Sequence, residues 1–280
     1  MPEGDTVHKL AAVVRQEVEG HSLTDCYLRG IHESEKLVGS RVDSVEVIGK
    51  HMLLHLDVSL FIRVHLGMHG SWHRYKPGQA WKRPKSSAAV ILKTESVVLV
   101  CFNAMDLEVV RSGQRGWHTR LNSLGPDLLS ENEHEWQKVL ERFRNLRSPT
   151  DTLGESLLDQ KVVCGIGNVY KSELAFLGPL EKDPFIPAQL GISPWRPLSE
   201  ITDEEMIGIY RRARLLMQAN LGGWMRTTTV DRRVCAGPRQ GNLHIYGLVG
   251  NPCRRCRGRI RKGQQGLQNR VTYWCPDCQR

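Results

Sequence analysis

Apolar residues follow a helical period near the start of the chain. Five of them recur three to four residues apart: Val7, Leu10, Ala11, Val14 and Val18. Side chains at this spacing share one face of an α-helix, and the Gly20 that follows is a natural C-terminal stop. The pattern predicts an amphipathic helix over residues 6–20.

Between residues 41 and 110 the pattern changes to short runs rich in Val, Leu and Ile, separated by Gly, Pro or Lys-Ser breaks. The runs are RVDSVEVI, HMLLHLDV, LFIRVHL, AAVILKT and SVVLVCF. Runs of this length and composition are typical of β-strands. A β-sandwich or barrel behind the N-terminal helix is therefore predicted.

Beyond residue 129 the pattern is helical again. One amphipathic helix is marked by four residues: Trp136, Val139, Leu140 and Phe143. A second is predicted over 201–223, where Thr202 and Glu205 form a capping box and Gly222 is the stop. The chain is thus expected to be a multi-domain α+β protein with a mostly β domain at 1–125, a helical domain at 126–240 and a small tail at 241–280.

Charge is concentrated in the tail. The formal net charge of the chain is +9, and residues 251–280 hold eight Lys and Arg against one acid. A polyanion such as nucleic acid fits this distribution, and a solvated tail is the alternative. No apolar run reaches the roughly 18 residues that span a bilayer, and no signal peptide is evident. We expect a cytoplasmic protein with no membrane partner.

Two CxxC pairs separated by 18 residues close the chain: Cys253, Cys256, Cys275 and Cys278. Their number and spacing are those of a four-thiolate zinc site, which leaves no open position for water. One structural zinc ion is therefore predicted, on a β-hairpin that includes Gly266. The other cysteines have mostly apolar neighbours and are predicted to be buried or semi-buried structural thiols: Cys26, Cys101, Cys164 and Cys235.

A glycine-rich turn, Gly165-Ile166-Gly167-Asn168, separates two helical stretches. Two glycines allow a tight turn and a close approach to another chain. The helix that follows offers free N–H groups to a phosphate. A plain helix–helix connector is the alternative interpretation.

Six motifs, taken together, resemble the formamidopyrimidine-DNA glycosylase and endonuclease VIII family of base-excision repair enzymes. They are PEG at 2–4, GKH at 49–51, HLGMHGSW at 65–72, LGPDLL at 124–129, GIGNVYKSE at 165–173 and YWCPDCQ at 273–279. The resemblance spans nearly the whole chain. It implies an N-terminal β-sandwich with a leading helix, a helical helix–two-turns–helix domain and a C-terminal four-cysteine zinc finger.

The resemblance also implies a bifunctional DNA glycosylase and AP lyase. Once Met1 is removed, the nitrogen of Pro2 attacks C1′ of a flipped-out damaged nucleotide, and Glu3 supplies a proton. An N-terminal amine has a pKa near 8, so a useful fraction is a neutral nucleophile at pH 7. The resulting iminium cation draws electrons and promotes β,δ-elimination. The partner is damaged DNA, no small-molecule cofactor is needed, and the expected state is a monomer near the nucleoid.

Further roles carry over by position. Lys50 is expected to contact phosphate and assist elimination, and Arg270 to bind the lesion's phosphates with two parallel N–H bonds. Met68 corresponds to the apolar wedge that fills the space left by the flipped base. Three residues of the glycine-rich turn and its helix are expected to contact DNA: Gly167, Asn168 and Lys171.

Gly4, in place of Leu, resembles the endonuclease VIII branch, especially its second type in actinobacteria, so oxidised pyrimidines are the expected lesions. An Arg and a Phe of the formamidopyrimidine branch are absent from FNAMDLEVV at 102–110, where Leu107 is a partial substitute. Gly67 and Ser123 depart from residues that the endonuclease VIII branch can carry. The alternative function is a catalytically silent zinc-ribbon DNA-binding protein on the same fold, which leaves the Pro2-Glu3 pair unexplained.

Overall fold

The computed structural model describes residues 2–111, 121–130, 135–223, 225–229 and 242–280. The chain divides into two compact units, Met1–Ser123 and Leu124–Arg280. In the described part, no helix combines the length and the apolar character needed to cross a membrane. Met1 and Cys235, which carry two of the expectations above, lie outside the described residues.

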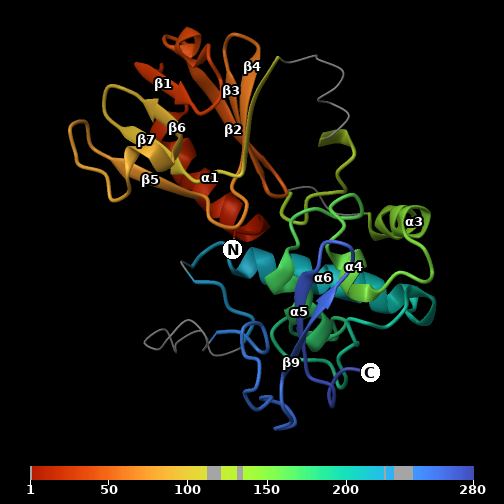
Figure 1. The fold of residues 1–280 in the computed structure, drawn as a ribbon. Coiled ribbons are helices and arrows are strands. Elements are labelled where there is room, and N and C mark those ends of the chain that lie inside the picture. Colours follow the sequence, from red (N-terminus) through yellow and green to blue (C-terminus); the bar gives the residue numbers. More distant parts are fainter. Residues whose placement is uncertain (1, 112–120, 131–134, 224, 230–241) are drawn as a thin grey trace. The chain divides into compact units, whose positions relative to one another are not determined.

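The first unit is an antiparallel β-sandwich that begins with a helix (Figure 1). One sheet has the strand order β1-β6-β7-β5 and the other β2-β3-β4-β8. The elements are α1 (Gly4–Val18), β1 (Asp25–Leu28), β2 (Val42–Ile48), β3 (His51–Leu56), β4 (Leu60–His65), β5 (Ser71–Tyr75), β6 (Ala88–Lys93), β7 (Val98–Phe102), β8 (Asp106–Arg111) and the 3-10 turns η1 (Ser34–Leu37) and η2 (Lys85–Ser87).

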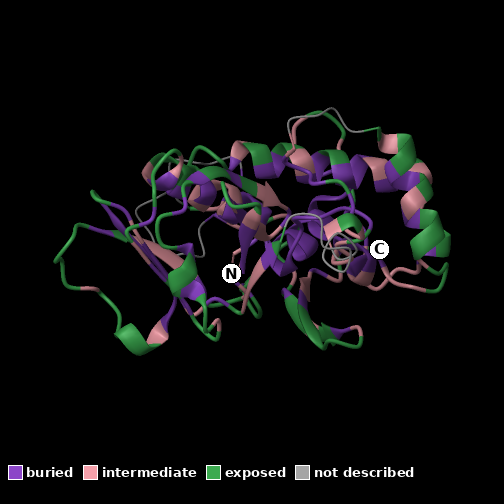
Figure 2. Ribbon diagram, turned by 90° about the horizontal axis from the view of Figure 1, so that it is seen from above, coloured by how far each residue is buried: buried purple, intermediate pink, exposed green. Residues whose placement is uncertain are grey.

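The core of this unit joins the apolar face of α1 to the inner faces of both sheets. Val7 and Val14 of α1 are buried in one cluster with Val90 and Leu92 of β6 and other strand residues. Because strand side chains alternate between faces, the neighbours of these strand residues point to the opposite side. Figure 2 colours each residue by its burial. Strand β7 is buried at every position, because its side chains divide between two apolar clusters on the two faces of the sheet.

The second unit is mainly helical and ends in a β-hairpin. Its elements are α3 (Trp136–Leu146), α4 (Leu153–Leu157), α5 (Asn168–Leu177), η3 (Leu198–Glu200), α6 (Asp203–Ala219), β9 (Arg261–Gln265) and β10 (Arg270–Trp274). Every residue of α5 is buried. Four of them, Tyr170, Leu174, Ala175 and Leu177, pack among residues of α3, α4 and α6 in the main core of the unit, and Phe176 packs in a second cluster with the cysteines of the hairpin. Helix α5 is therefore the central element around which the others pack.

The predicted fold class is confirmed, including the N-terminal helix and all five strand runs. Strands β1, β5 and β8 were not predicted; β5 and β8 mix polar and apolar side chains rather than forming apolar runs. The capping box of α6 is confirmed: the Glu205 N–H donates to Thr202 Oγ1 at 3.2 Å, and the Thr202 N–H donates to a Glu205 carboxylate oxygen at 2.9 Å.

The predicted end of α6 at Gly222 was wrong. The helix ends at Ala219, and Asn220 caps it. The Asn220 Nδ2 donates to the Leu216 carbonyl at 2.8 Å and to the Tyr170 hydroxyl at 3.1 Å. A buried amide that satisfies the helix end locally makes a glycine stop unnecessary.

Three of the scattered cysteines, Cys26, Cys101 and Cys164, are buried as predicted. Burial raises the pKa of the Cys26 and Cys101 thiols to about 12. Thiols held in this neutral form are poor nucleophiles. They therefore contribute packing rather than chemistry.

Candidate active site and nucleic-acid interface

Pro2 and Glu3 lie immediately before helix α1. Glu3 has extended backbone angles and is the N-cap, and its carbonyl accepts the N–H groups of Thr6 at 2.9 Å and Val7 at 3.0 Å. Pro2 is half-buried, whereas Glu3 is fully buried. The first helical turn thus holds Glu3 next to Pro2, and the positive end of the helix dipole favours an acidic group at this position.

A two-residue hairpin turn presents Lys50. Ile48 of β2 pairs with His51 of β3, so only Gly49 and Lys50 lie in the loop. Gly49 has φ +59°, which matches the type II′ turn that needs glycine at its first central position. The turn fixes the backbone of Lys50 at the tip of a rigid hairpin.

A buried polar cluster lies behind Lys50. Arg63 is only 2% exposed and forms ion pairs with Asp106 and with Glu108. Its Nη1 lies 3.0 Å from His51 Nδ1. Because a guanidinium only donates, His51 must accept with a neutral ring. Burial, His65 and Arg63 together lower the pKa of His51 to about 3, which agrees with that assignment.

His65 completes this cluster. Its ring centroid lies 4.9 Å from that of His51. Burial and the Lys50 charge lower the pKa of His65. Both imidazoles are therefore neutral at pH 7. Neither histidine adds a positive charge next to Lys50.

The predicted wedge residue, Met68, is 58% exposed in the turn that follows β4. A second methionine, Met105, is 68% exposed, and its N–H donates to the His65 carbonyl at 3.0 Å. Gly67 has φ +64°, and a Cβ built there would lie 2.6 Å from the Met105 Cβ. The missing side chain at Gly67 thus lets Met105 pack against the turn that carries Met68.

Met105 was missed in the sequence, where Leu107 was suggested for this position. Leu107 is instead partly buried against the main core of the first unit. Leu107 lies within β8 and pairs with Val64 of β4, whereas Met105 precedes the first residue of that strand. The signal available in the sequence was the position of Met105, an apolar residue between Ala104 and Asp106 at the start of a strand.

In the second unit, the glycine-rich turn leads into α5 as predicted. Gly165 has φ +112°, and the Gln160 side chain spans the turn by accepting the Gly165 N–H at 3.1 Å and donating to the Ile166 carbonyl at 3.0 Å. Gly167 is the N-cap of α5. The turn therefore fixes where α5 begins and how Asn168 is oriented.

Asn168 and Lys171 both contact strand β10. The Asn168 Nδ2 donates to the Val271 carbonyl at 2.7 Å, and the Lys171 ammonium donates to Thr272 Oγ1 at 2.6 Å and to the Val271 carbonyl at 3.3 Å. Lys171 is fully buried. The direct DNA contact predicted for Lys171 stays a prediction, and this geometry favours a supporting role.

The Lys171 contacts continue into a hydrogen-bond chain. Thr272 Oγ1 donates to Gln265 Oε1 at 2.8 Å, and Gln265 Nε2 donates to Thr152 Oγ1 at 2.8 Å. Gln265 pairs in register with Arg270. Arg270 itself is exposed, and its Nε donates to Gln268 Oε1 at 3.1 Å. The base of the hairpin is fixed from the protein interior while Arg270 faces solvent.

Glu173 links α5 to the segment that leads into the hairpin. One carboxylate oxygen accepts the His244 N–H at 2.8 Å and the Thr228 hydroxyl, and the other accepts the N–H groups of Ile245 at 2.9 Å and Tyr246 at 2.8 Å. A buried carboxylate is tolerated when both oxygens are hydrogen-bonded. Glu173 therefore positions this segment.

The four clustered cysteines come together as predicted. Their sulfur atoms all lie within 4.8 Å of one another, and the Cys253–Cys278 and Cys256–Cys275 sulfurs are 3.8 Å and 3.4 Å apart. Metal–sulfur bonds of about 2.3 Å give a tetrahedral edge of about 3.8 Å. Arg255 and Gly258 donate backbone N–H groups to Cys253 and Cys256. The cluster fits one tetrahedral metal ion.

Comparisons with known proteins agree with this arrangement. Residues 1–107 match the model of the formamidopyrimidine-DNA glycosylase N-terminal domain. The chain is 35% identical to the probable endonuclease 8 2 of Streptomyces coelicolor over 100% of this chain and 94% of the relative. It is also 35% identical to the DNA-(apurinic or apyrimidinic site) lyase Nei2 of Mycolicibacterium smegmatis, over 100% and 99%.

Among solved structures, the Lactococcus lactis formamidopyrimidine DNA glycosylase bound to an AP-site-containing DNA has a TM-score of 0.77, with 18% identity and full coverage of both chains. That likeness establishes the fold. The sandwich, the helical unit and the four-cysteine hairpin define a chain of the DNA glycosylase fold. Together with the relatives above, they show that the chain belongs to the formamidopyrimidine-DNA glycosylase and endonuclease VIII family.

Replacing Lys171 with Met tests the contacts that hold β10. The change keeps an unbranched apolar stem but removes the donor to Thr272 and Val271, so we expect the free energy of unfolding to fall by about 1–3 kcal/mol. Urea denaturation measures this, with the exposed Lys161→Met as matched control. Equal stability of the two variants would contradict the assigned role of Lys171.

Proposed function

We propose that this chain is a bifunctional DNA glycosylase and AP lyase of base-excision repair that removes oxidised pyrimidines through the nitrogen of Pro2. The names of its relatives, endonuclease 8 and AP lyase, support the activity. The observation that carries the mechanism is the Pro2-Glu3 pair at the start of α1, with Glu3 fully buried beside it.

The proposed reaction proceeds in three stages. The neutral Pro2 nitrogen, freed by loss of Met1, bonds to C1′ as the damaged base leaves and the deoxyribose ring opens, with Glu3 donating the proton. The resulting iminium withdraws electrons from C2′, which loses a proton as the 3′ phosphate departs. A second elimination releases the 5′ phosphate. The first stage needs both residues of the pair, because the Pro2 nucleophile and the Glu3 acid must be oriented next to the same sugar.

The remaining predicted site residues bind the DNA backbone in this proposal. Lys50, at its rigid hairpin tip, and the exposed Arg270 hold phosphates next to the lesion. Asn168 uses the second hydrogen of its amide nitrogen, and the Gly167 backbone allows close approach. Lys171 acts indirectly, by holding the strand on which Arg270 lies.

We assign the metal of the cysteine cluster to zinc, because four thiolates and tetrahedral spacing suit this ion. It would brace the β9–β10 hairpin without entering the reaction. Atomic emission should find about one zinc per chain, and Cys275→Ser should lose it. A different metal, or none, would contradict the assignment.

The proposed partner is damaged DNA, bound by a monomer in the cytoplasm near the nucleoid. The segments 126–240 and 241–280 are proposed to act as a helix–two-turns–helix domain and a zinc finger. Sedimentation of the purified chain with and without an abasic-site duplex tests the stoichiometry. A stable dimer in both states would argue against the monomer.

Borohydride trapping tests Pro2 as the nucleophile. With an abasic-site duplex, the wild-type chain should form a covalent protein–DNA adduct, because borohydride reduces the iminium. Pro2→Gly should slow trapping, and an uncleaved N-terminal tag should abolish it by blocking the amine. Peptide mapping locates the linkage.

The outcome also separates the two candidate functions. Undiminished trapping by the tagged chain would rule out the Pro2 nitrogen. An absence of any adduct or cleavage, with DNA binding intact, would favour the catalytically silent binding protein.

Met68 and Met105 together form the proposed wedge. Replacing both with Ala should lower excision of thymine glycol and dihydrouracil about 10-fold or more, while cleavage of a preformed abasic site falls less, because that substrate has no base to extrude. A lesion panel that includes 8-oxoguanine measures both effects. Met225→Ala, in the second unit and 42% exposed, is the control. Equal losses on all substrates would contradict the wedge.

Arg270→Ala should weaken DNA binding and reduce its dependence on salt. Removing one phosphate contact lowers the slope of log affinity against log salt by about 0.9. Fluorescence anisotropy from low to moderate salt measures this, and Lys182→Ala removes one exposed charge elsewhere in the second unit as a control. An unchanged slope for Arg270→Ala would refute the phosphate contact.

A further inference from the structure

The sheet β1-β6-β7-β5 has a second face that the core does not use. Val90 and Leu92 of β6 point into the main core with α1. Their neighbour Ile91 instead belongs to a separate apolar cluster with Val100 and Phe102 of β7. This outer face is therefore opposite to the face covered by α1, the helix that Pro2 precedes.

The segment 76–87 covers one half of this outer face. Trp81 stacks on Tyr75 of β5 with ring centroids 6.0 Å apart, and it meets Phe102 edge-on at 5.9 Å. The Lys82 N–H donates to the Tyr75 hydroxyl at 3.1 Å. These contacts hold Trp81 over β5 and β7.

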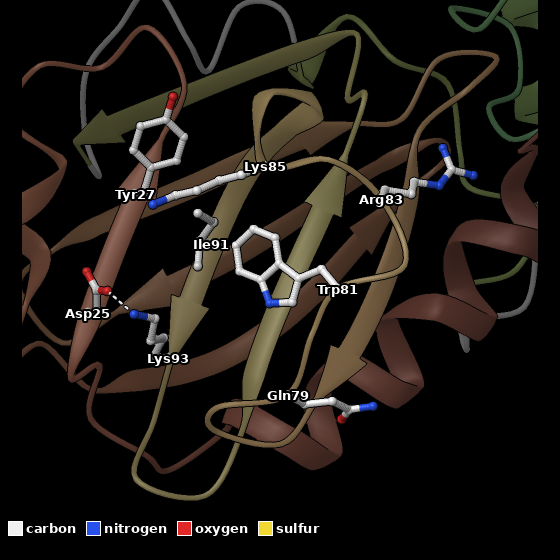
Figure 3. A pocket seen from close by; sticks show the side chains of 8 residues that line it. All are labelled: Asp25, Tyr27, Gln79, Trp81, Arg83, Lys85, Ile91 and Lys93. Atoms are coloured by element: carbon white, nitrogen blue, oxygen red, sulfur yellow. Dashed lines mark ion pairs between the residues drawn. The ribbon is translucent and has the colours of Figure 1, made fainter.

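The half over β1 and β6 is open and forms a pocket of about 570 Å³ (Figure 3). Trp81 and Ile91 lie at its centre, Tyr27 and Lys85 lie beside Ile91, and Arg83 lines the rim beyond Trp81, with its guanidinium directed outward. Small-ligand sites typically have roughly 300–1,000 Å³. The pocket is large enough for one nucleobase and its sugar.

The charges of the pocket favour an anion. Its one acid, Asp25, is neutralised by Lys93 at 2.5 Å. The side chains of Arg83 and Lys85 form no ion pair with any described residue. Both are exposed, as is Tyr27 at 45%. Two uncompensated cations therefore border an aromatic floor.

We infer that this pocket is a second nucleic-acid site, which holds one base of a single-stranded segment against Trp81 and Tyr27 and its phosphates on Arg83 and Lys85. Stacking on aromatic side chains combined with backbone cations is how single strands are bound without sequence preference. A duplex would not fit, because its bases are already stacked on each other. The site stands on its own chemistry, whether or not Pro2 is a nucleophile.

Photo-cross-linking of the full chain tests this site. A six-nucleotide single strand with one 5-iododeoxyuridine is irradiated with the protein, and cross-linked peptides are identified by mass spectrometry. An excess of duplex with a tetrahydrofuran abasic analogue fills the proposed lesion site. We expect cross-links at Trp81 or Tyr27 that persist in the presence of the duplex.

Two variants of equal charge change provide the control. Lys85→Glu should lower the cross-linking at least about fivefold, whereas Lys76→Glu, exposed on the same segment but outside the pocket, should not. Tyr27→Ala should give a loss of about fivefold, as expected for one stacking contact. Circular dichroism checks that each variant is folded.

Several results would overturn the inference. These are cross-links only at other residues, displacement by the duplex, and equal losses in both Glu variants. If free deoxyuridine monophosphate competed as strongly as the single strand does, the ligand of the pocket would be a mononucleotide and not a single strand. Borohydride trapping is run in parallel. If the Pro2 mechanism fails but the pocket binds a single strand, the cross-links are intact and no borohydride adduct forms.

Discussion

Helix α5 is buried on all sides, and this constraint organises the second unit. Its ten consecutive buried residues include polar side chains, and buried polar groups are costly unless they are hydrogen-bonded within the protein. Asn168 and Lys171 find theirs on β10, and Glu173 accepts from the segment at 244–246. The polar side chains of one helix therefore fix the hairpin that carries Arg270. The four clustered cysteines lie at the other end of the same hairpin, two before β9 and two after β10.

This arrangement shows what a sequence pattern alone does not reveal about Lys171, namely that its ammonium is buried against β10. Its motif, GIGNVYKSE, marks a phosphate-binding turn in the family, and a lysine in such a turn suggests a direct contact. The apolar spacing around it does not reveal that α5 has no exposed face, since Tyr170, Leu174 and Phe176 are also compatible with one apolar side. Only the packing of α6 and β10 against the helix decides where the ammonium lies.

Much of the fold was predictable because its signals are local. The apolar period of α1, the Val- and Leu-rich strands and the capping box of Thr202 each depend on a few adjacent residues. The cysteine spacing likewise predicted a cluster that the structure brings together. Strand β5 was not predicted, because its pairing with β7, rather than its own apolar content, holds it in the sheet. The Pro2, Glu3 and Lys50 roles came from the motifs of the family, and no local pattern would have assigned them.

The turn at Gly67 shows how a departure from a family pattern has a structural consequence. Where the endonuclease VIII branch can carry a glutamine, this chain has no side chain and a positive φ, and Met105 occupies the space. A glutamine there would meet the Met105 Cβ and require the methionine to move. Loss of one polar side chain is thus coupled to the position of a neighbouring apolar one. The glycine at position 67 therefore sets where Met105 lies relative to the turn that carries Met68, and both methionines stay largely exposed there.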